Sequence, residues 1–157
     1  MITVEEAQQK ILEVTAPLGA AGNRRACVRS PDGVFVELME ADPLPAAGPG
    51  PGREACGTAV RSVTLSVPDL EQTVAFFGGA LGLPRADLPL HGAEHESLWG
   101  LAGARTKSAL FTAGDVLVEA VQYLDPPGKP WPEGYRISDQ GILNIAFGAR
   151  SRDVLFQ

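Results

Sequence analysis

Apolar and polar residues alternate along five short segments of the chain, as they do in half-buried β-strands. The segments are 24–30 (RRACVRS), 34–40 (VFVELME), 60–67 (VRSVTLSV), 107–113 (KSALFTA) and 116–123 (VLVEAVQY). Turn-forming residues join two pairs of these segments, PDG at 31–33 and GD at 114–115. The pattern predicts two β-hairpins, 24–40 and 107–123, and a separate strand at 60–67.

Apolar residues at helical spacing mark two further segments, 3–12 and 70–81. The second (LEQTVAFFGGAL) follows Pro68-Asp69 and places Leu70, Val74, Phe77 and Leu81 on one helix face. Additional strands are predicted at 96–101 and 142–148. Together these elements predict an α+β fold.

Two Pro/Gly-rich connectors without core periodicity, 46–59 and 125–140, divide the chain. They leave three structured parts, which are 1–45, 60–124 and 141–157. Only the middle part carries a full set of predicted elements, namely strand, helix and three strands.

The same unit recurs at a constant offset along the chain. Glu37 and Glu119 lie in matching strand-like runs, and their separation is 119 − 37 = 82 residues. Aligning VRSVTLSV with ILNIAFGA places Ser62 against Asn144, and 144 − 62 = 82 again. The two predicted hairpins align at this offset as well. The sequence therefore predicts an internal repeat, with one complete module at 60–124.

The second module is out of phase, because residues 1–45 match its latter part and residues 141–157 match its first strand and the start of its helix. Two explanations stay open. The chain could be circularly permuted, with its two ends meeting in space. Alternatively, it could be a portion of a longer chain, or complete its second module with a partner subunit.

Composition excludes several classes of partner. The formal net charge of −6 and the pI near 4.9 disfavour nucleic acid, which requires a basic face. No window has the roughly 18 consecutive apolar residues that a membrane helix needs. The start MITVEEAQQK does not resemble a secretory signal. Two cysteines, Cys27 and Cys56, are too few for a disulfide scaffold, so a cytoplasmic protein is expected.

The modules resemble the vicinal oxygen chelate superfamily, the group of glyoxalase I, bleomycin-resistance proteins and extradiol dioxygenases. The resemblance lies in SPDGVFVEL, in VTLSVPDLEQTVAFFGGALGLP and in the order of the elements, and it is strongest over 24–40 and 60–82. It implies that paired modules form a curled mixed sheet with a cup that holds a small organic molecule, often in a homodimer. One such fold hosts many chemistries.

The resemblance also implies roles for the two recurring acids. Glu37 and Glu119 stand where the family has a glutamate metal ligand that points into the cup. The family's histidine ligand, on the first strand of each module, is replaced here by Ser62 and Asn144. Neither suits zinc, iron or nickel, so we expect that the usual metal centre is lost. Ser62 and Asn144 could instead hydrogen-bond Glu119 and Glu37, or a ligand.

Both histidines, His91 and His95, occur in LHGAEHESLWG, which we interpret as a polar loop entering a strand. His95 alternates with Ser97 and Trp99, so it could face the cup and act as an acid or base. Trp99 and Tyr123 are candidates for a wall that contacts the ligand.

A further aromatic residue, Phe111, is better explained as core. The aromatic residues of the second connector, Trp131 and Tyr135, could fold over the cup or simply hold their loop.

Three functions are compatible with these sequence features, and whether the protein is an enzyme stays open. The first is metal-free binding of a small organic molecule, for sequestration or resistance, with no cofactor. The second is a lyase, isomerase or dioxygenase that uses a divalent metal held by Glu37 and Glu119. The third is a metal-free isomerase in which Glu119 or Glu37 acts as the base. We rank the first above the others.

Overall fold

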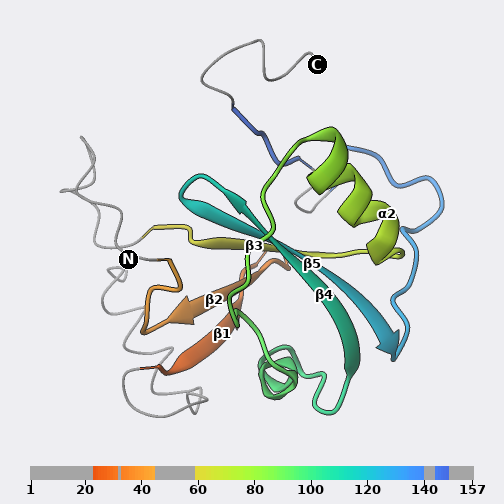
Figure 1. The fold of residues 1–157 in the computed structure, drawn as a ribbon. Helices are drawn as coiled ribbons and strands as arrows, with labels where there is room; N and C mark the ends of the chain where they lie inside the picture. The colour runs from red at the N-terminus through yellow and green to blue at the C-terminus, as the bar shows by residue number, and fades with distance from the viewer. Residues whose placement is uncertain (1–22, 32, 45–58, 140–143, 149–157) are drawn as a thin grey trace. The chain divides into compact units, whose positions relative to one another are not determined.

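A computed structural model describes residues 23–31, 33–44, 59–139 and 144–148 (Figure 1). The chain divides into two compact units. The first comprises Met1–Asp42, His91–Gly103 and Arg136–Ile142, and the second comprises Pro43–Leu90, Ala104–Tyr135 and Leu143–Gln157. The expected helix at 3–12 lies outside the described residues.

The first unit contains the first predicted hairpin. Strands β1 (Arg25–Arg29) and β2 (Phe35–Met39) pair in antiparallel fashion. The Ser30 N–H donates to the Val34 carbonyl at 2.8 Å, so the connection between the paired residues is three residues long, 31–33. Gly33 has a φ of 85°, a left-handed conformation that glycine adopts without strain. The prediction of a hairpin over 24–40 is confirmed.

The second structured segment of the first unit, η2 (Ala93–Trp99), is a 3-10 helix that contacts β1. The predictions of a strand at 96–101 and of a non-helical loop before it are therefore wrong. Local polar contacts explain the difference, because the Ser97 hydroxyl donates to the Glu94 carbonyl and the Gly92 N–H donates to His95 Nδ1, both at 2.8 Å. Such short-range bonds compete with strand pairing.

The second unit contains a mixed sheet of β3 (Ser62–Ser66), β4 (Arg105–Ala113) and β5 (Val116–Asp125). The strand order is β3-β5-β4, with β3 parallel to β5 and β4 antiparallel to it. Two strands follow the helix of this module rather than three. In addition, the Ala86 N–H bonds the Leu110 carbonyl and the Thr112 N–H bonds the Pro84 carbonyl, so a short segment lies along the far edge of β4.

The predicted helix at 70–81 is present, as α2 (Leu70–Val74) continued by the π-helix η1 (Ala75–Ala80). Asp69 caps it, because its Oδ1 accepts from the Gln72 N–H at 3.0 Å. The helix thus begins where Pro68-Asp69 predicted.

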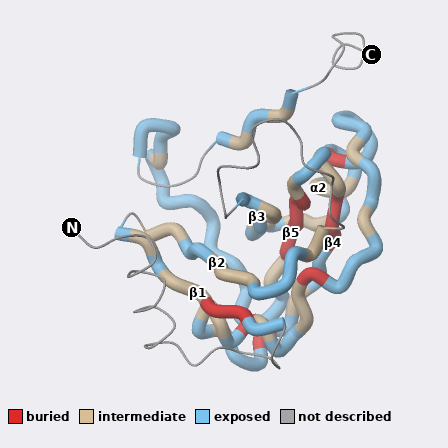
Figure 2. The backbone as a smooth tube through the Cα atoms, turned by 90° about the vertical axis from the view of Figure 1, so that its left-hand side faces the viewer, coloured by how far each residue is buried: buried red, intermediate tan, exposed pale blue. Residues whose placement is uncertain are grey.

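One core joins helix and sheet in the second unit. Phe77, Ala109, Phe111 and Val118 are buried against one another. Figure 2 shows buried stretches of β4 and β5 beside α2. Phe111 is completely buried, at 0% exposure, which confirms its interpretation as a core residue.

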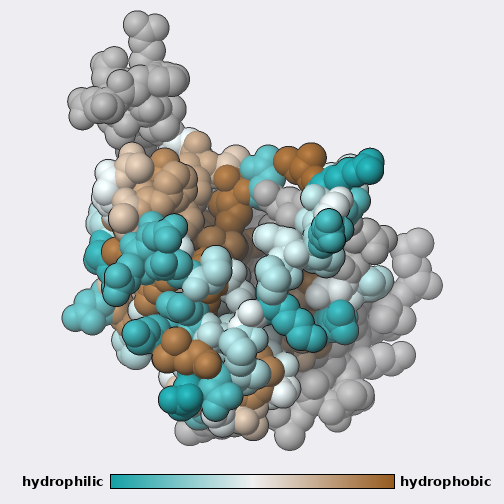
Figure 3. Space-filling model, turned by 90° about the vertical axis from the view of Figure 1, so that its right-hand side faces the viewer, coloured by the Kyte–Doolittle hydropathy of each residue, from teal (hydrophilic) through white to brown (hydrophobic). Residues whose placement is uncertain are grey.

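Large apolar side chains also reach the surface (Figure 3). Those that are more than half exposed in the described residues include Phe76, Val60, Trp131 and Ile137. Although Phe76 neighbours Phe77 in the helix, it points away from the core. No helix in the described ranges is long and apolar enough to cross a membrane.

The expected curled sheet is not found, because the described residues form a two-stranded sheet and a three-stranded sheet, and neither closes into a cup. The expected strand at 142–148 is also not formed over its described part, 144–148. From 126 to 139 the chain forms turns and one isolated bridge, in which Pro127 pairs with Leu124.

The two hairpins differ in pairing register. Cys27 lies opposite Glu37, whereas Leu110 lies opposite Glu119. The offset of 82 would place Cys27 on Ala109, so the registers differ by one residue. The turns explain this, because the second hairpin closes with the two residues Gly114-Asp115, one fewer than the first. A change of one residue in register exchanges the faces of a strand.

Replacing Phe111 with alanine is expected to cost about 3–5 kcal/mol of the free energy of unfolding, because it removes a fully buried ring and leaves a cavity. Phe76→Ala is the matched control, since that residue is 54% exposed, and it should cost under about 1 kcal/mol. Urea unfolding followed by circular dichroism measures both. Equal losses would contradict this assignment of the core.

Candidate functional site

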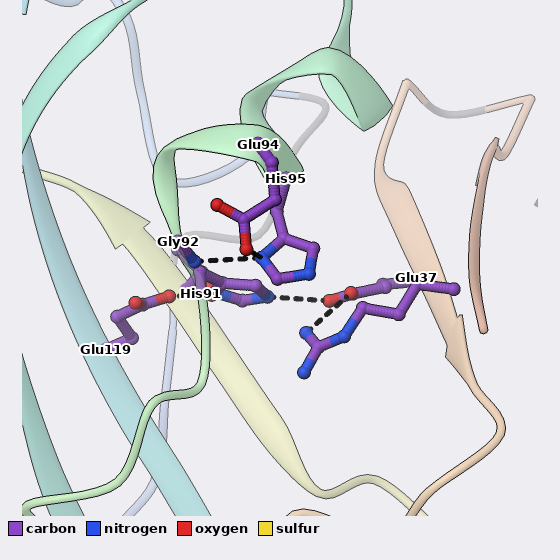
Figure 4. A network of polar contacts seen from close by, with 8 residues as sticks. Glu37, His91, Gly92, Glu94, His95 and Glu119 are labelled. Carbon is purple, nitrogen blue, oxygen red and sulfur yellow. Dashed lines mark hydrogen bonds and ion pairs between the residues drawn. The ribbon is translucent and has the colours of Figure 1, made fainter. Parts of the chain in front are cut away.

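A cluster of charged side chains surrounds Glu37 in the first unit. Glu37 Oε1 accepts a hydrogen bond from Arg25 Nη1 at 3.0 Å, and Glu37 Oε2 lies 2.8 Å from His91 Nε2 (Figure 4). All three side chains are largely buried, with exposed fractions of 12% for Glu37, 8% for Arg25 and 7% for His91. Both carboxylate oxygens of Glu37 therefore have a cationic or N–H partner.

The hairpin register brings Arg25 to this carboxylate. Cys27 is directly opposite Glu37, and Arg25 is two positions along β1, so it lies on the same face as a diagonal neighbour. Lys107 is the counterpart of Arg25 at the offset of 82, but it pairs with Gln122 in a register that puts it on the face opposite to Glu119. The longer turn of the first hairpin thus creates a pairing that the second hairpin lacks.

Glu37 is ionised at neutral pH. Burial alone raises its pKa, but the hydrogen bond and charge of His91, followed by those of Arg25, outweigh burial and hold the pKa of Glu37 below its ordinary value. An ionised carboxylate accepts hydrogen bonds only. His91 Nε2 therefore carries a proton, and this N–H donates a hydrogen bond to Glu37 Oε2.

His95 adopts a defined tautomer. Its Nδ1 accepts from the Gly92 N–H at 2.8 Å, so the proton of the neutral ring is on Nε2. Burial and the nearby charge of Arg25 lower the pKa of His95, against the opposing effect of Glu94. His95 is thus a neutral hydrogen-bond donor at neutral pH, and its expected role as an acid or base stays a prediction.

Trp99 belongs to the same cluster. Its ring meets the His91 ring edge to face at a centroid distance of 5.2 Å, and the rings of His91 and His95 are 5.9 Å apart. Trp99 thus packs against a polar side chain of the cluster, and its expected role as a ligand wall stays a prediction.

The second acid, Glu119, lies in the second unit and is only 3% exposed. Its Oε2 accepts from the Thr64 hydroxyl at 2.9 Å, because Thr64 is opposite Glu119 in the parallel β3–β5 pair. Ser62 is opposite Leu117 instead. The hydroxyl that bonds Glu119 is therefore that of Thr64 and not that of Ser62, and a role for Ser62 toward a ligand stays a prediction.

The remaining predicted residues are in the second unit. Asn144 is exposed and outside any strand, and Tyr123 is half-buried on β5. Trp131 and Tyr135 stack on each other with ring centroids 4.6 Å apart, and Trp131 is 67% exposed. The structure thus brings Glu37, His95 and Trp99 together, whereas the other predicted residues belong to the other unit.

Two members of the cluster, Arg25 and His91, were not predicted as site residues. Arg25 was a strand residue without an assigned role, and His91 was assigned to a loop. Strand alternation predicts that Arg25 and Cys27 lie on one face of the strand. Whether Glu37 lies on that same face depends on the pairing register, which is set by the length of the turn.

A cation would not be favoured beside Glu37, because the Arg25 guanidinium is 3.0 Å from its carboxylate and repels a metal ion. Within the described residues, no three His, Cys, Asp or Glu side chains are grouped so that they could hold a metal ion. Comparisons of the chain with protein-family models, with curated proteins and with solved structures give no significant match.

The lowered pKa of Glu37 predicts a stability that depends on pH. The ion pairs stabilise the fold fully above the ordinary glutamate pKa of about 4.3, and this stabilisation is lost as the pH falls through the lower folded-state pKa. Wild-type protein should therefore lose more stability between about pH 5 and pH 3 than Glu37→Gln. Glu133→Gln, which alters an exposed carboxylate, should behave like wild type. The midpoint of urea unfolding, measured at several pH values in this range, tests the prediction. If the midpoints of wild type and Glu37→Gln fall equally with pH, the prediction is wrong.

Replacing Thr64 with valine should cost about 1–3 kcal/mol, because this nearly isosteric change removes a hydroxyl donor from the buried Glu119. Ser62→Ala, on the same strand, is the control and should cost under about 1 kcal/mol. Chemical unfolding of both variants measures the difference. A larger loss for Ser62→Ala would show that the wrong hydroxyl is assigned to Glu119.

Proposed function

We propose that the chain is a small-molecule-binding protein of the glyoxalase, bleomycin-resistance and dioxygenase type that works without the usual histidine metal centre. The observation that carries this proposal is the state of Glu37. The residue that occupies the family's ligand position has both oxygens bound, one to Arg25 and one to His91. A metal ion would have to displace a buried guanidinium and an imidazole.

The replacement of both family histidines supports the same proposal. Ser62 and Asn144 offer neutral oxygen and amide groups, which bind first-row transition metals poorly. These groups are suited to hydrogen bonds with a polar organic molecule.

The proposal includes the paired architecture of the family. In it, the module at 60–124 pairs with a second module to which 1–45 and 141–157 contribute, within one chain or with a partner subunit. The topology of the second unit supports the modular part, because a strand, a helix and a hairpin follow one another with β3 parallel to β5.

The catalytic alternatives rank lower. A metal-dependent lyase, isomerase or dioxygenase is disfavoured by the positive charge of Arg25 beside Glu37. For a metal-free isomerase, the lowered pKa makes Glu37 a weak base, so Glu119 is the better candidate. Glu119→Gln would then abolish turnover while ligand affinity stays nearly unchanged.

After dialysis against a chelator, the purified chain should contain no stoichiometric first-row metal, because Arg25 and His91 already satisfy Glu37. Added zinc, nickel or magnesium should leave Tm unchanged within about 1 °C, since a ligand that does not bind the native state does not stabilise it. Elemental analysis and thermal denaturation measure these outcomes.

A matched variant makes this experiment sharper. Arg25→Met removes the competing cation and should allow Glu37 to interact with added metal more readily than it does in wild type. Recovery of one zinc, nickel or iron per wild-type chain, lost in Glu37→Gln, would remove the proposal in favour of the metal-dependent alternative.

A further inference from the structure

We propose that strand β3 joins two copies of this chain into a dimer, by pairing in antiparallel fashion with β3 of the second copy. Such a dimer forms whether or not a small molecule binds, so the inference goes beyond the proposed function. The two edges of the three-stranded sheet differ in a way that points to this pairing.

One edge of the sheet is covered and the other is open. Along β4, the Ala86 N–H donates to the Leu110 carbonyl at 2.9 Å. The Thr112 N–H donates to the Pro84 carbonyl at the same distance, so a segment of the chain lies along that edge. β3 forms the opposite edge, and within the described residues its only sheet partner is β5.

The open edge presents a row of backbone donors and acceptors. The Arg61 carbonyl accepts from the Leu117 N–H, and the Val67 N–H donates to a carbonyl of β5, both at 2.8 Å. The odd-numbered residues of this segment therefore face β5. Because the direction alternates along a strand, the N–H and C=O groups of the residues between them point away from the sheet. These residues are Ser62, Thr64 and Ser66.

β3 lacks the features that usually keep an edge strand from pairing. Proline, charged side chains and bulges are the common protections. None of them occurs in β3, and its register with β5 is continuous. Gly128 borders one end of the edge, where an added Cβ would be 3.8 Å from Ser66 Oγ, but no backbone hydrogen bond joins the two in the described part of the chain. Thr64 and Ser66 are exposed, so another strand has access to the edge.

The sequence of β3 (SVTLS) is complementary to itself in the antiparallel direction. A two-fold axis at Thr64 pairs this residue with its own copy, and Ser62 of one copy with Ser66 of the other. Each outward N–H then meets a carbonyl. On the other face, Val63 lies opposite Leu65, which packs against the core cluster of its own unit. Threonine pairs and aliphatic pairs of this kind stabilise antiparallel ladders.

The charges at the two ends of the edge favour the same direction. Arg61 precedes β3, and Asp69 follows it. Antiparallel pairing brings the positive end of one copy to the negative end of the other, whereas parallel pairing brings like charges together. Hydrogen bonding, side-chain pairing and charge thus agree on a second copy of β3 as the occupant of the edge.

Size-exclusion chromatography with light scattering measures the mass of the full chain. Wild type should have a mass of 2 × 16.5 = 33 kDa. Ser62→Lys combined with Ser66→Lys should reduce the mass to 16.5 kDa, because lysines of the two copies then face each other. Ser62→Lys combined with Ser66→Glu is the matched control. It places lysine opposite glutamate across the two-fold axis and should keep the mass at 33 kDa.

Two results of this measurement would overturn the inference. A wild-type mass of 16.5 kDa would leave the edge to a strand of a different protein. Equal masses for the two double variants would show that any dimer uses another surface.

Amide hydrogen exchange of wild type provides a test that does not depend on whether the variants fold. The amides of Ser62, Thr64 and Ser66 face solvent in a single copy, so pairing should slow their exchange at least about tenfold. Exchange as fast as that of exposed loop amides, at concentrations where the mass is doubled, overturns the proposed interface.

The two proposals fail separately. A monomeric wild type would end the β3 dimer and leave the metal-free binding function standing. Stoichiometric metal at Glu37 would end the metal-free function, whatever the mass of the chain.

Discussion

The electrostatic balance of one carboxylate underlies the first unit. Glu37 sits in a short strand with most of its surface removed from water, and an unpaired charge there would be expensive. Arg25 and His91 neutralise it from two directions, one from the neighbouring strand and one from the segment that precedes η2. The three side chains thereby connect the hairpin to the segment that precedes the 3-10 helix.

The other recurring acid, in the second unit, accepts a hydrogen bond from a neutral hydroxyl. Glu119 is even less exposed, and a hydroxyl on the adjacent parallel strand donates to it. Around it, the core that contains Phe77 and Phe111 supplies ordinary apolar packing. The two recurring acids therefore share a sequence pattern, but Arg25 bonds Glu37 and Thr64 bonds Glu119.

Local patterns were sufficient to predict the hairpins and the helix, because alternation, turn residues and the Asp69 cap act over a few residues. They failed at 93–99, where bonds between side chains and nearby backbone replace the predicted strand. The partners of Glu37 could not be predicted from local patterns either. Whether Arg25 or Ala26 shares a face with Glu37 depends on one residue in the turn, and His91 is 54 residues away in sequence.

The longer connection at 31–33 shows how the length of a loop decides which side chains of two strands meet. Lengthening a loop by one residue needs no change in the strands. It nevertheless shifts the pairing register by one residue, so that different side chains share a face of the sheet. Lys107 is exposed in the second hairpin, whereas Arg25, at the equivalent place of the first, is the counter-ion of an acid. The length of a loop can thus create or remove an ion pair on the strands beside it, without any substitution in those strands.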